Sequence, residues 1–264
     1  MNRRTLPAIA TAIAIAALLA SGAQAAIKTE TVTYTSGSMT LKGYLAYDDT
    51  TTAKRPGVLL IHEWWGLNDY ARHRAEMLAK EGYVAFAADM FGDGKSTNHP
   101  QVAGEFASAA SKDPEAALAR FRAGLDQLKA NSRTDGSKVA AIGYCFGGRT
   151  VLGAAMNGID LAGVVSFHGS LPQAPAAPGT VKAKMLVLHG AADAFIPADQ
   201  VATFQKNLAE AGADLQFVSY SGAKHGFSNP DAGSYGLDGL AYDKAADQRS
   251  WKAMQSFFAE IFGK

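Results

Sequence analysis

Several features that would assign this chain to a specialised class of protein are missing from its 264 residues. Cysteine occurs only once, at Cys145, so no internal disulfide can form. The 25 Lys and Arg residues nearly balance the 24 Asp and Glu residues and form no basic cluster, which argues against binding to nucleic acid or to an anionic membrane surface. The sequence also has no internal repeat, no low-complexity tract and no linker between domains.

Long apolar runs are confined to the N-terminus. Arg3 and Arg4 precede the apolar segment Leu6–Ala20, and Ala23–Ala25 is a small-x-small pattern typical of a cleavage site. The apolar segment is shorter than the roughly 20 residues that cross a bilayer, which favours a removed signal peptide over an anchor. We therefore expect residues 1–25 to be a signal peptide and the mature protein to be periplasmic or secreted by a bacterium. The paired arginines leave the export pathway open.

Apolar strands and amphipathic helices alternate along residues 26–264, which we expect to form a single domain. Two alternating segments around residues 36–38 predict an antiparallel hairpin at the start of this domain. Further strands are predicted at 57–62, 83–88, 138–143, 162–167, 184–189 and 215–220. Helices are predicted at 70–80, from 101 onward with a break at 113–114, at 147–156, around 201–208 and around 251–261. The alternation predicts an α/β fold with a mostly parallel central sheet and helices on both faces.

Cys145 lies in the segment Gly143–Gly148 (Gly-Tyr-Cys-Phe-Gly-Gly), directly after a predicted strand. This is the G-x-nucleophile-x-G form of a sharp strand-to-helix turn, with a thiol where most such turns carry serine. The turn crowds the backbone on both sides of the nucleophile, so Gly143 and Gly147 leave the space that a Cβ would fill. The short pattern taken alone also fits a small buried thiol in the core.

Two further residues follow Cys145 in the order nucleophile, acid, histidine. Asp193 comes after the strand at 184–189, and His225 comes after the strand at 215–220. The carboxyl ends of parallel strands meet at one edge of a sheet, where ligands bind. Considered separately, Asp193 fits a helix cap or turn and His225 fits a solvated loop residue. Considered together with Cys145, they predict a Cys-His-Asp catalytic triad.

Four motifs in this chain resemble the dienelactone hydrolase family of the α/β-hydrolase superfamily, and the resemblance covers nearly all of the chain after residue 27. The motifs are Gly-Tyr-Cys-Phe-Gly-Gly at 143–148, His-Glu-Trp-Trp-Gly-Leu-Asn at 62–68, His-Gly-Ala-Ala-Asp at 189–193 and Ala-Lys-His-Gly-Phe at 223–227. The resemblance implies an α/β-hydrolase fold. We expect no cofactor, and no group of Cys, His, Asp and Glu residues has a spacing typical of metal ligands. The resemblance also implies that Cys145 is the nucleophile, His225 the base and Asp193 the group that orients the base.

Glu63 corresponds, by the same resemblance, to a carboxylate that holds the resting thiol. A carboxylate close to a thiol would accept its hydrogen bond and disfavour a second negative charge. The alternative is a surface glutamate that pairs with Arg72 or Arg74. The preceding His62 ends a predicted buried strand, so we expect its ring to satisfy backbone groups rather than to react.

The backbone N–H groups of Trp64 and Phe146 correspond in the family to the donors of an oxyanion hole. Trp65 fits either the wall of the pocket or the core. We expect the substrate pocket to be lined by Tyr144, Trp65, Phe227 and Asn229. The dienelactone enzymes bind the carboxylate of their substrate with arginines, one of them a few residues beyond the histidine, where this chain has Asn229. The missing guanidinium argues against a dienelactone carboxylate as substrate.

A thiol nucleophile favours substrates with an activated carbonyl group. The tetrahedral adduct expels either the thiolate or the substrate's leaving group, and thiolate leaves more readily than a simple alkoxide because thiols are much stronger acids than alcohols. Enol lactones and thioesters avoid this problem because their leaving groups are stabilised anions. We therefore predict a monomeric hydrolase of small-molecule lactones or activated esters, with no nucleic-acid or membrane partner. A thioesterase, a general carboxylesterase and a non-catalytic ligand-binding protein on the same fold are the alternatives.

Overall fold

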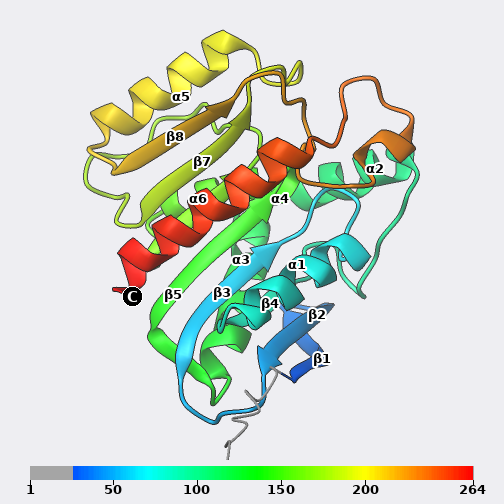
Figure 1. The fold of residues 1–264 in the computed structure, drawn as a ribbon, viewed down its shortest axis with the longest axis vertical. Helices are drawn as coiled ribbons and strands as arrows, with labels where there is room; N and C mark the ends of the chain where they lie inside the picture. Colours follow the sequence, from blue (N-terminus) through cyan, green and yellow to red (C-terminus); the bar gives the residue numbers. More distant parts are fainter. Residues whose placement is uncertain (1–25, 264) are drawn as a thin grey trace, which may run out of the picture.

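The computed structural model describes residues 26–263, so the signal peptide expected at residues 1–25 lies outside the described residues. The described residues form an eight-stranded sheet in the order β1-β2-β4-β3-β5-β6-β7-β8 (Figure 1). The strands are β1 (Ile27–Ser36), β2 (Met39–Asp48), β3 (Arg55–Ile61), β4 (Val84–Ala88), β5 (Thr134–Tyr144), β6 (Gly163–Phe167), β7 (Lys184–Gly190) and β8 (Leu215–Tyr220). β2 pairs antiparallel with β1 and with β4, and the other neighbouring strands are parallel. The predicted α/β fold with an antiparallel N-terminal hairpin is therefore confirmed.

Helices connect these strands, and each helix predicted from the sequence is present. They are α1 (Asp69–Lys80), α2 (Pro100–Ser111), α3 (Pro114–Ala130), α4 (Phe146–Met156), α5 (Ala198–Glu210), the short 3₁₀ helix η1 (Ala232–Tyr235) and α6 (Lys244–Phe262). The break between α2 and α3 occurs where predicted, because Asp113 caps the first N–H groups of α3 and Pro114 occupies its first turn. Within residues 26–263, no helix has the length and apolar character needed to cross a membrane.

Two hydrophobic cores lie on the two faces of the sheet. Helices α1 and α6 cover one face, through side chains such as Leu78 and Phe258. Helices α3, α4 and α5 cover the other face, through side chains such as Phe121. In β3, Leu59 packs into one core and Leu60 into the other, because successive side chains of a strand point to opposite faces. This double burial fixes the register of the central strands and therefore the positions of the loops that follow them.

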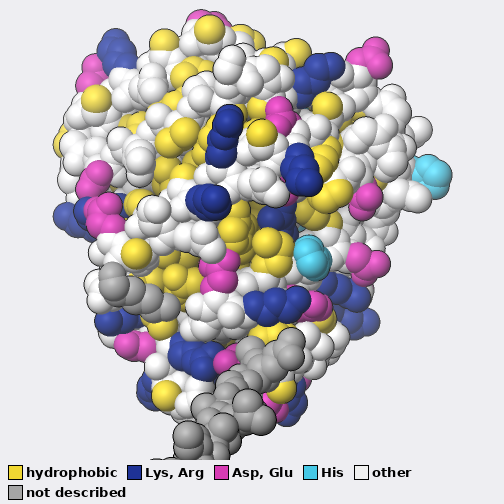
Figure 2. All heavy atoms as spheres, viewed as in Figure 1, with side chains coloured by type: hydrophobic (Ala, Val, Ile, Leu, Met, Phe, Trp, Pro, Cys, Tyr) yellow, Lys and Arg dark blue, Asp and Glu magenta, His cyan; other side chains and the backbone are white. Residues whose placement is uncertain are grey.

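The outer surface carries charges of both signs. On the face shown in Figure 2, Lys and Arg side chains are interspersed with Asp and Glu side chains, and hydrophobic atoms lie between them. No broad area of positive charge is seen on this face, in keeping with a formal net charge of +1 for the whole sequence. That face lacks the basic surface that a nucleic acid requires.

Candidate active site

Cys145 lies between β5 and α4 in a backbone conformation that L-residues rarely adopt, with φ 54° and ψ −111°. The surrounding contacts hold this conformation. Its N–H donates to the carbonyl of Phe167 at 3.0 Å. A Cβ on Gly143 would collide with the carbonyl of Gly147, and a Cβ on Gly147 would collide with the carbonyl of Ile61. The glycines are therefore required by close backbone packing, as the sequence predicted, and the strain is stored at the one cysteine.

The structure brings the side chains of Cys145, His225 and Asp193 together. His225 Nε2 lies 3.0 Å from Cys145 Sγ, and His225 Nδ1 lies 2.7 Å from Asp193 Oδ2. The Asp193 side chain is fully buried, and the loop residue Phe195 donates its N–H to the other carboxylate oxygen at 2.9 Å. One nitrogen of the imidazole therefore faces the sulfur while the other is fixed by a carboxylate, which is the arrangement that sets the tautomer of a general base.

The electrostatics of this chain favour a positively charged imidazole. Burial alone would lower the pKa of His225, because it disfavours the cation. The charge on Cys145 and the hydrogen bond to Asp193 act in the opposite direction and outweigh burial, so the pKa of His225 is raised. A thiolate beside an imidazolium is the reactive form of a cysteine nucleophile.

A cavity of about 340 Å³ opens onto the sulfur and the imidazole. Besides Cys145 and His225, its lining consists of Trp64, Ser170, Phe195, Leu237 and Leu240. Phe195 remains 52% exposed and its ring meets the His225 imidazole edge to face, with the ring centroids 5.3 Å apart. A small apolar acyl group would fit such a space, and the reacting atoms lie on its wall.

The cavity is lined by a different set of residues from the one predicted. Of the aromatic pair Trp64 and Trp65, only Trp64 reaches the cavity; Trp65 is buried and stacks on Tyr235 with ring centroids 3.8 Å apart. Tyr144 and Phe227 are fully buried in the core. None of these three side chains belongs to the lining of the cavity.

Glu63 is buried, so the alternative of a surface glutamate paired with Arg72 or Arg74 is wrong. Its Oε2 accepts a hydrogen bond from Asn229 Nδ2 at 2.6 Å, and Asn229 is itself buried, so it supports Glu63 rather than lining the cavity. Among the described residues no hydrogen bond joins Glu63 to Cys145, whose partner is His225. Burial raises the pKa of Glu63 to about 7, against the opposing effects of the Asn229 hydrogen bond and the charge on His225.

The backbone N–H groups of Trp64 and Phe146 flank this region from two loops. Phe146 is the first residue of α4, where an N–H has no acceptor within the helix. Among the described residues, neither N–H has a backbone or side-chain hydrogen-bond acceptor. Both therefore remain available to an oxygen atom bound beside the sulfur. The positive end of the α4 dipole favours negative charge at the same place.

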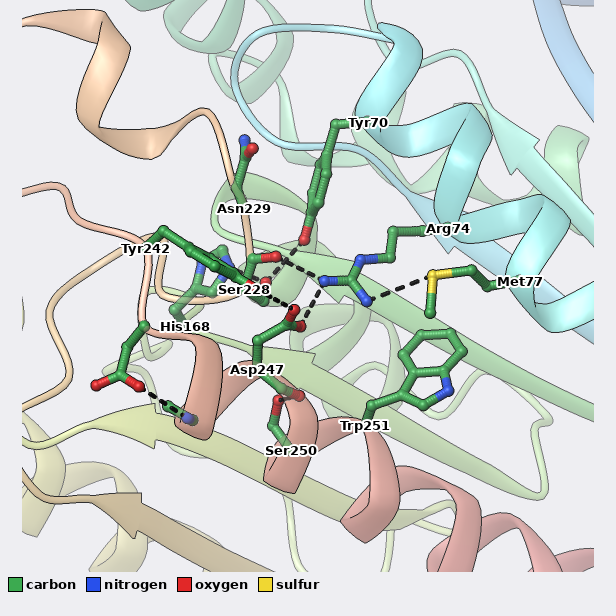
Figure 3. A network of polar contacts seen from close by, with 12 residues as sticks. Tyr70, Arg74, Met77, His168, Ser228, Asn229, Tyr242, Asp247, Ser250 and Trp251 are labelled. Carbon is green, nitrogen blue, oxygen red and sulfur yellow. Dashed lines mark hydrogen bonds and ion pairs between the residues drawn. The ribbon is translucent and has the colours of Figure 1, made fainter.

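A second polar network, which was not predicted from the sequence, lies behind the imidazole (Figure 3). Arg74 is 4% exposed and donates to the carbonyl of Ser228 at 2.6 Å and to Asp247 Oδ1 at 2.5 Å. The hydroxyl of Ser228 lies 2.7 Å from the hydroxyl of Tyr70 and 2.8 Å from His168 Nε2. Ser228 follows His225 by three residues, so this network fixes the segment that carries the imidazole.

His168 is the member of this network nearest to the reactive pair. Its backbone is in the left-handed region with φ 40°, and its ring meets the His225 ring edge to face with centroids 5.3 Å apart. Burial, with the charge of His225, holds the pKa of His168 well below its ordinary value. A neutral ring thus packs against the imidazole of His225 and adds no competing charge.

His62, as expected, satisfies backbone groups. Its Nδ1 contacts the Glu63 carbonyl at 2.6 Å, and its Nε2 accepts from the Met90 N–H at 3.3 Å.

Other parts of the described chain do not offer an equivalent site. A larger cavity, of about 430 Å³, adjoins Arg74 and Asp247, but no nucleophile paired with a base lines it. No group of three or more His, Cys, Asp or Glu side chains within residues 26–263 is arranged to hold a metal ion.

The eight-stranded sheet, the strained turn after β5 and the histidine and acid on later loops define an α/β hydrolase. The sequence profile of the dienelactone hydrolase family matches residues 41–262, so the chain belongs to that family. A solved structure from metagenomic libraries, described as the dienelactone hydrolase-like promiscuous phosphotriesterase P91, is 38% identical, with a TM-score of 0.86 over 89% of this chain and 98% of that chain.

Two curated relatives extend along nearly the same length. Protein usf of Aquifex pyrophilus is 31% identical over 87% of this chain and 97% of its own length. A protein of Aquifex aeolicus, provisionally named carboxymethylenebutenolidase, is 28% identical over 86% of this chain and 96% of its own length. The family membership makes this chain a carboxylic-ester hydrolase that acts on lactones or esters of small molecules.

Proposed function

We propose that the chain hydrolyses a lactone or activated ester through a Cys-His-Asp triad and a thioester intermediate. The observation that carries this proposal is the continuous chain of hydrogen bonds from Cys145 through His225 to Asp193. Sulfur attacks the carbonyl carbon and the imidazole gives its proton to the leaving oxygen. A water molecule then attacks the thioester, the imidazole takes the proton of that water, and the thiolate leaves.

Two further features support the attack on a carbonyl group. The N–H groups of Phe146 and Trp64 are without acceptors among the described residues, and an oxyanion formed at the carbonyl would take hydrogen bonds from both. The apolar cavity holds the acyl or lactone part of the substrate beside the sulfur. A thiolate leaving group favours esters whose own leaving group is a stabilised anion, which points to enol lactones and aryl esters rather than to simple alkyl esters.

p-Nitrophenyl acetate tests the proposal directly. The wild-type protein should release p-nitrophenolate with turnover, and rapid quenching followed by peptide mass spectrometry should find an acetyl group on Cys145. Cys145→Ala should lose the acetylation and at least about a thousandfold of the rate, as is typical when a triad member is removed. A wild-type rate equal to that of Cys145→Ala would contradict the proposal and favour a ligand-binding protein on the same fold.

The choice between a lactonase and a thioesterase needs a second comparison. A six-membered enol lactone and an acyl thioester of similar size would be assayed under the same conditions, with kcat/KM as the readout. A higher value for the enol lactone supports the proposed substrate class. A higher value for the thioester assigns the same triad to thioester hydrolysis.

A second candidate activity is the hydrolysis of neutral phosphotriesters. It is suggested by the likeness to the phosphotriesterase P91, with which this chain shares 38% identity and the fold. The thiolate would attack phosphorus and the aryloxide would leave. Paraoxon tests this activity: release of p-nitrophenolate over several turnovers supports it, whereas one equivalent released with permanent loss of esterase activity contradicts it.

We further propose that residues 1–25 direct export and are removed, and that the mature chain is a monomer. N-terminal sequencing of protein from a periplasmic fraction should begin at Ala26, and light scattering after size-exclusion chromatography should give the mass of one chain. Retention of residues 1–25, or a dimer mass, would contradict the respective proposal.

A further inference from the structure

The cavity around Cys145 is unusually poor in groups that could hold a charged substrate. The reactive pair and Ser170 are the polar members of its lining, and the others are two aromatic residues and two leucines, namely Trp64, Phe195, Leu237 and Leu240. None of the described residues that line it is Lys or Arg. An anionic group that entered this space would lose its hydration and gain no ion pair, which is a large cost in an apolar site.

Two cationic side chains close in sequence or space to the site have partners elsewhere. Arg74 is held by Asp247 and by the carbonyl of Ser228. Lys224, next to His225 in the chain, is exposed and donates to the carbonyl of Asp238 at 3.1 Å. Neither side chain belongs to the lining of the cavity. Among the described residues that line the cavity, the one cation is the imidazolium of His225, and that charge is already paired with Asp193 and the sulfur.

Negative groups, on the other hand, are close to the reactive pair. The Asp193 carboxylate is hydrogen-bonded to the imidazole, and the buried Glu63 carboxyl interacts with the charge on His225. The partner of Glu63 is the neutral amide of Asn229 rather than a cation. Two acidic side chains therefore lie near the reactive pair, and no Lys or Arg among the described residues that line the cavity offsets them for the carboxylate of a substrate.

We propose that this site selects uncharged substrates with an apolar acyl group and rejects acyl groups that carry a carboxylate. This inference rests on the proposed function, because it concerns the substrate of the same nucleophile. Selectivity is set mainly by Leu237 and Leu240, which come from the segment 230–243 and line the cavity together with Cys145.

Backbone hydrogen bonds and ring stacking hold the segment 230–243 in place at the cavity. Leu240 forms an isolated parallel bridge with His225, and the next residue, Ala241, donates its N–H to the His225 carbonyl at 3.2 Å. At the other end of the segment, Tyr235 stacks on the buried Trp65. These contacts hold the two leucines at the cavity while the imidazole keeps its position beside the sulfur.

Three esters with the same p-nitrophenyl leaving group test the selectivity of the wild-type protein. They are the butyrate, the monosuccinate, which replaces the terminal methyl by a carboxylate, and the methyl ester of that succinate. At about pH 7.5 the monosuccinate is ionised. We expect its kcat/KM to be at least about a hundredfold below that of the butyrate, and the methyl succinate to lie within about tenfold of the butyrate because it carries no charge.

Leu240→Arg introduces a cation into the wall, and Leu240→Gln is the matched variant with a long polar but neutral side chain. The arginine variant should raise the ratio of monosuccinate to butyrate kcat/KM by at least about tenfold, because it supplies the missing ion pair. The glutamine variant should change that ratio by less than about threefold. Circular dichroism of both variants shows whether they are folded, and the wild-type comparison decides the question if they are not.

The outcomes separate this inference from the proposed function. Equal kcat/KM values for butyrate and monosuccinate would overturn the selectivity while leaving the thiol mechanism supported by the turnover of both esters. Poor turnover of the methyl succinate and the monosuccinate alike would also overturn it, because size rather than charge would then discriminate. Absence of turnover for all three esters would overturn the proposed function and this inference with it.

Discussion

The buried carboxyl of Glu63 should make the stability of the folded protein fall as pH rises through neutrality. The pKa of Glu63 is raised from 4.5 to about 7 by burial, so the folded state binds this proton more tightly than the unfolded chain does. The stability that follows from the bound proton is fully present below about pH 4.5 and is lost as pH rises to about 7. Glu63→Gln keeps the shape and the acceptor for Asn229 but cannot ionise.

The size of the effect follows from the two pKa values. A pKa difference of one unit corresponds to about 1.4 kcal/mol, so ionising Glu63 in the folded state costs about 3 kcal/mol relative to the unfolded chain. At pH 5 the free energy of unfolding of the wild type is reduced by only a small part of this amount, and at pH 8 it is reduced by nearly all of it. The free energy of unfolding of Glu63→Gln, taken relative to the wild type, should therefore increase by about 2.5 kcal/mol between about pH 5 and pH 8.

Urea unfolding followed by tryptophan fluorescence at pH 5, 6, 7 and 8 (roughly spanning the transition) measures this difference. Glu210→Gln is the control, because Glu210 is exposed at the end of α5 and, within residues 26–263, pairs only with Lys206 at 3.8 Å. The control should stay within about 0.5 kcal/mol of the wild type at every pH. A constant difference between Glu63→Gln and the wild type across this range would refute the reasoning, because it would mean that Glu63 does not change its charge there.

Three further predictions concern the turn, the buried network and the acid. Gly147→Ala should destabilise the fold by at least about 2 kcal/mol and lower kcat, because its Cβ would meet the backbone of β3. Gly153→Ala is the control in the same helix: its Cβ has open space, so it should stabilise the fold by up to about 1 kcal/mol. Thermal unfolding of the two variants compares these effects. Arg74→Met should lower the free energy of unfolding by about 3–5 kcal/mol, because it removes the cationic partner of Asp247. Adding Asp247→Leu should recover part of that loss. Equal free energies of unfolding for the single and double variants, measured in urea, would contradict this prediction. Asp193→Asn should lower kcat about a thousandfold or more with little change in the unfolding midpoint, and a loss smaller than tenfold would show that the acid does not fix the tautomer of the imidazole.

The sheet and the positions of the three central residues could be predicted because the signals for them are local. The turn around Cys145 is specified by glycines within a few residues of it. Asp193 comes three residues after the buried strand β7, and His225 comes five residues after β8, which is a partly exposed strand at the end of the sheet. Parallel strands covered on both faces place such loops at one edge of the sheet. The order of the strands, which puts β3 between β4 and β5, comes from packing between distant segments and leaves no local pattern.

The lining of the cavity and the buried network could not be predicted, for two physical reasons. Closeness in the chain to a site residue does not place a side chain in the pocket: Tyr144, next to Cys145, is buried in the core, and Trp65, next to Trp64, is buried against Tyr235. Leu237 and Leu240, which do line the pocket, lie in a loop without any periodicity. Arg74 occurs one turn after Tyr70 on the buried face of α1, which was a usable sign that it needs a partner, but Asp247 is 173 positions away.

The segment 225–229 joins His225 to the buried network, and we expect a displacement of that network to move the imidazole. On one side His225 faces the sulfur; on the other side, three residues later, Ser228 is held by Arg74, Tyr70 and His168. A chain so short transmits a shift of Ser228 to the imidazole, whose distance from the sulfur must be kept within a few tenths of an ångström for proton transfer. Substitutions at Arg74 should therefore lower kcat at urea concentrations well below the unfolding midpoint, whereas substitutions in the hairpin β1–β2, far along the sheet, should lower activity only as the protein unfolds.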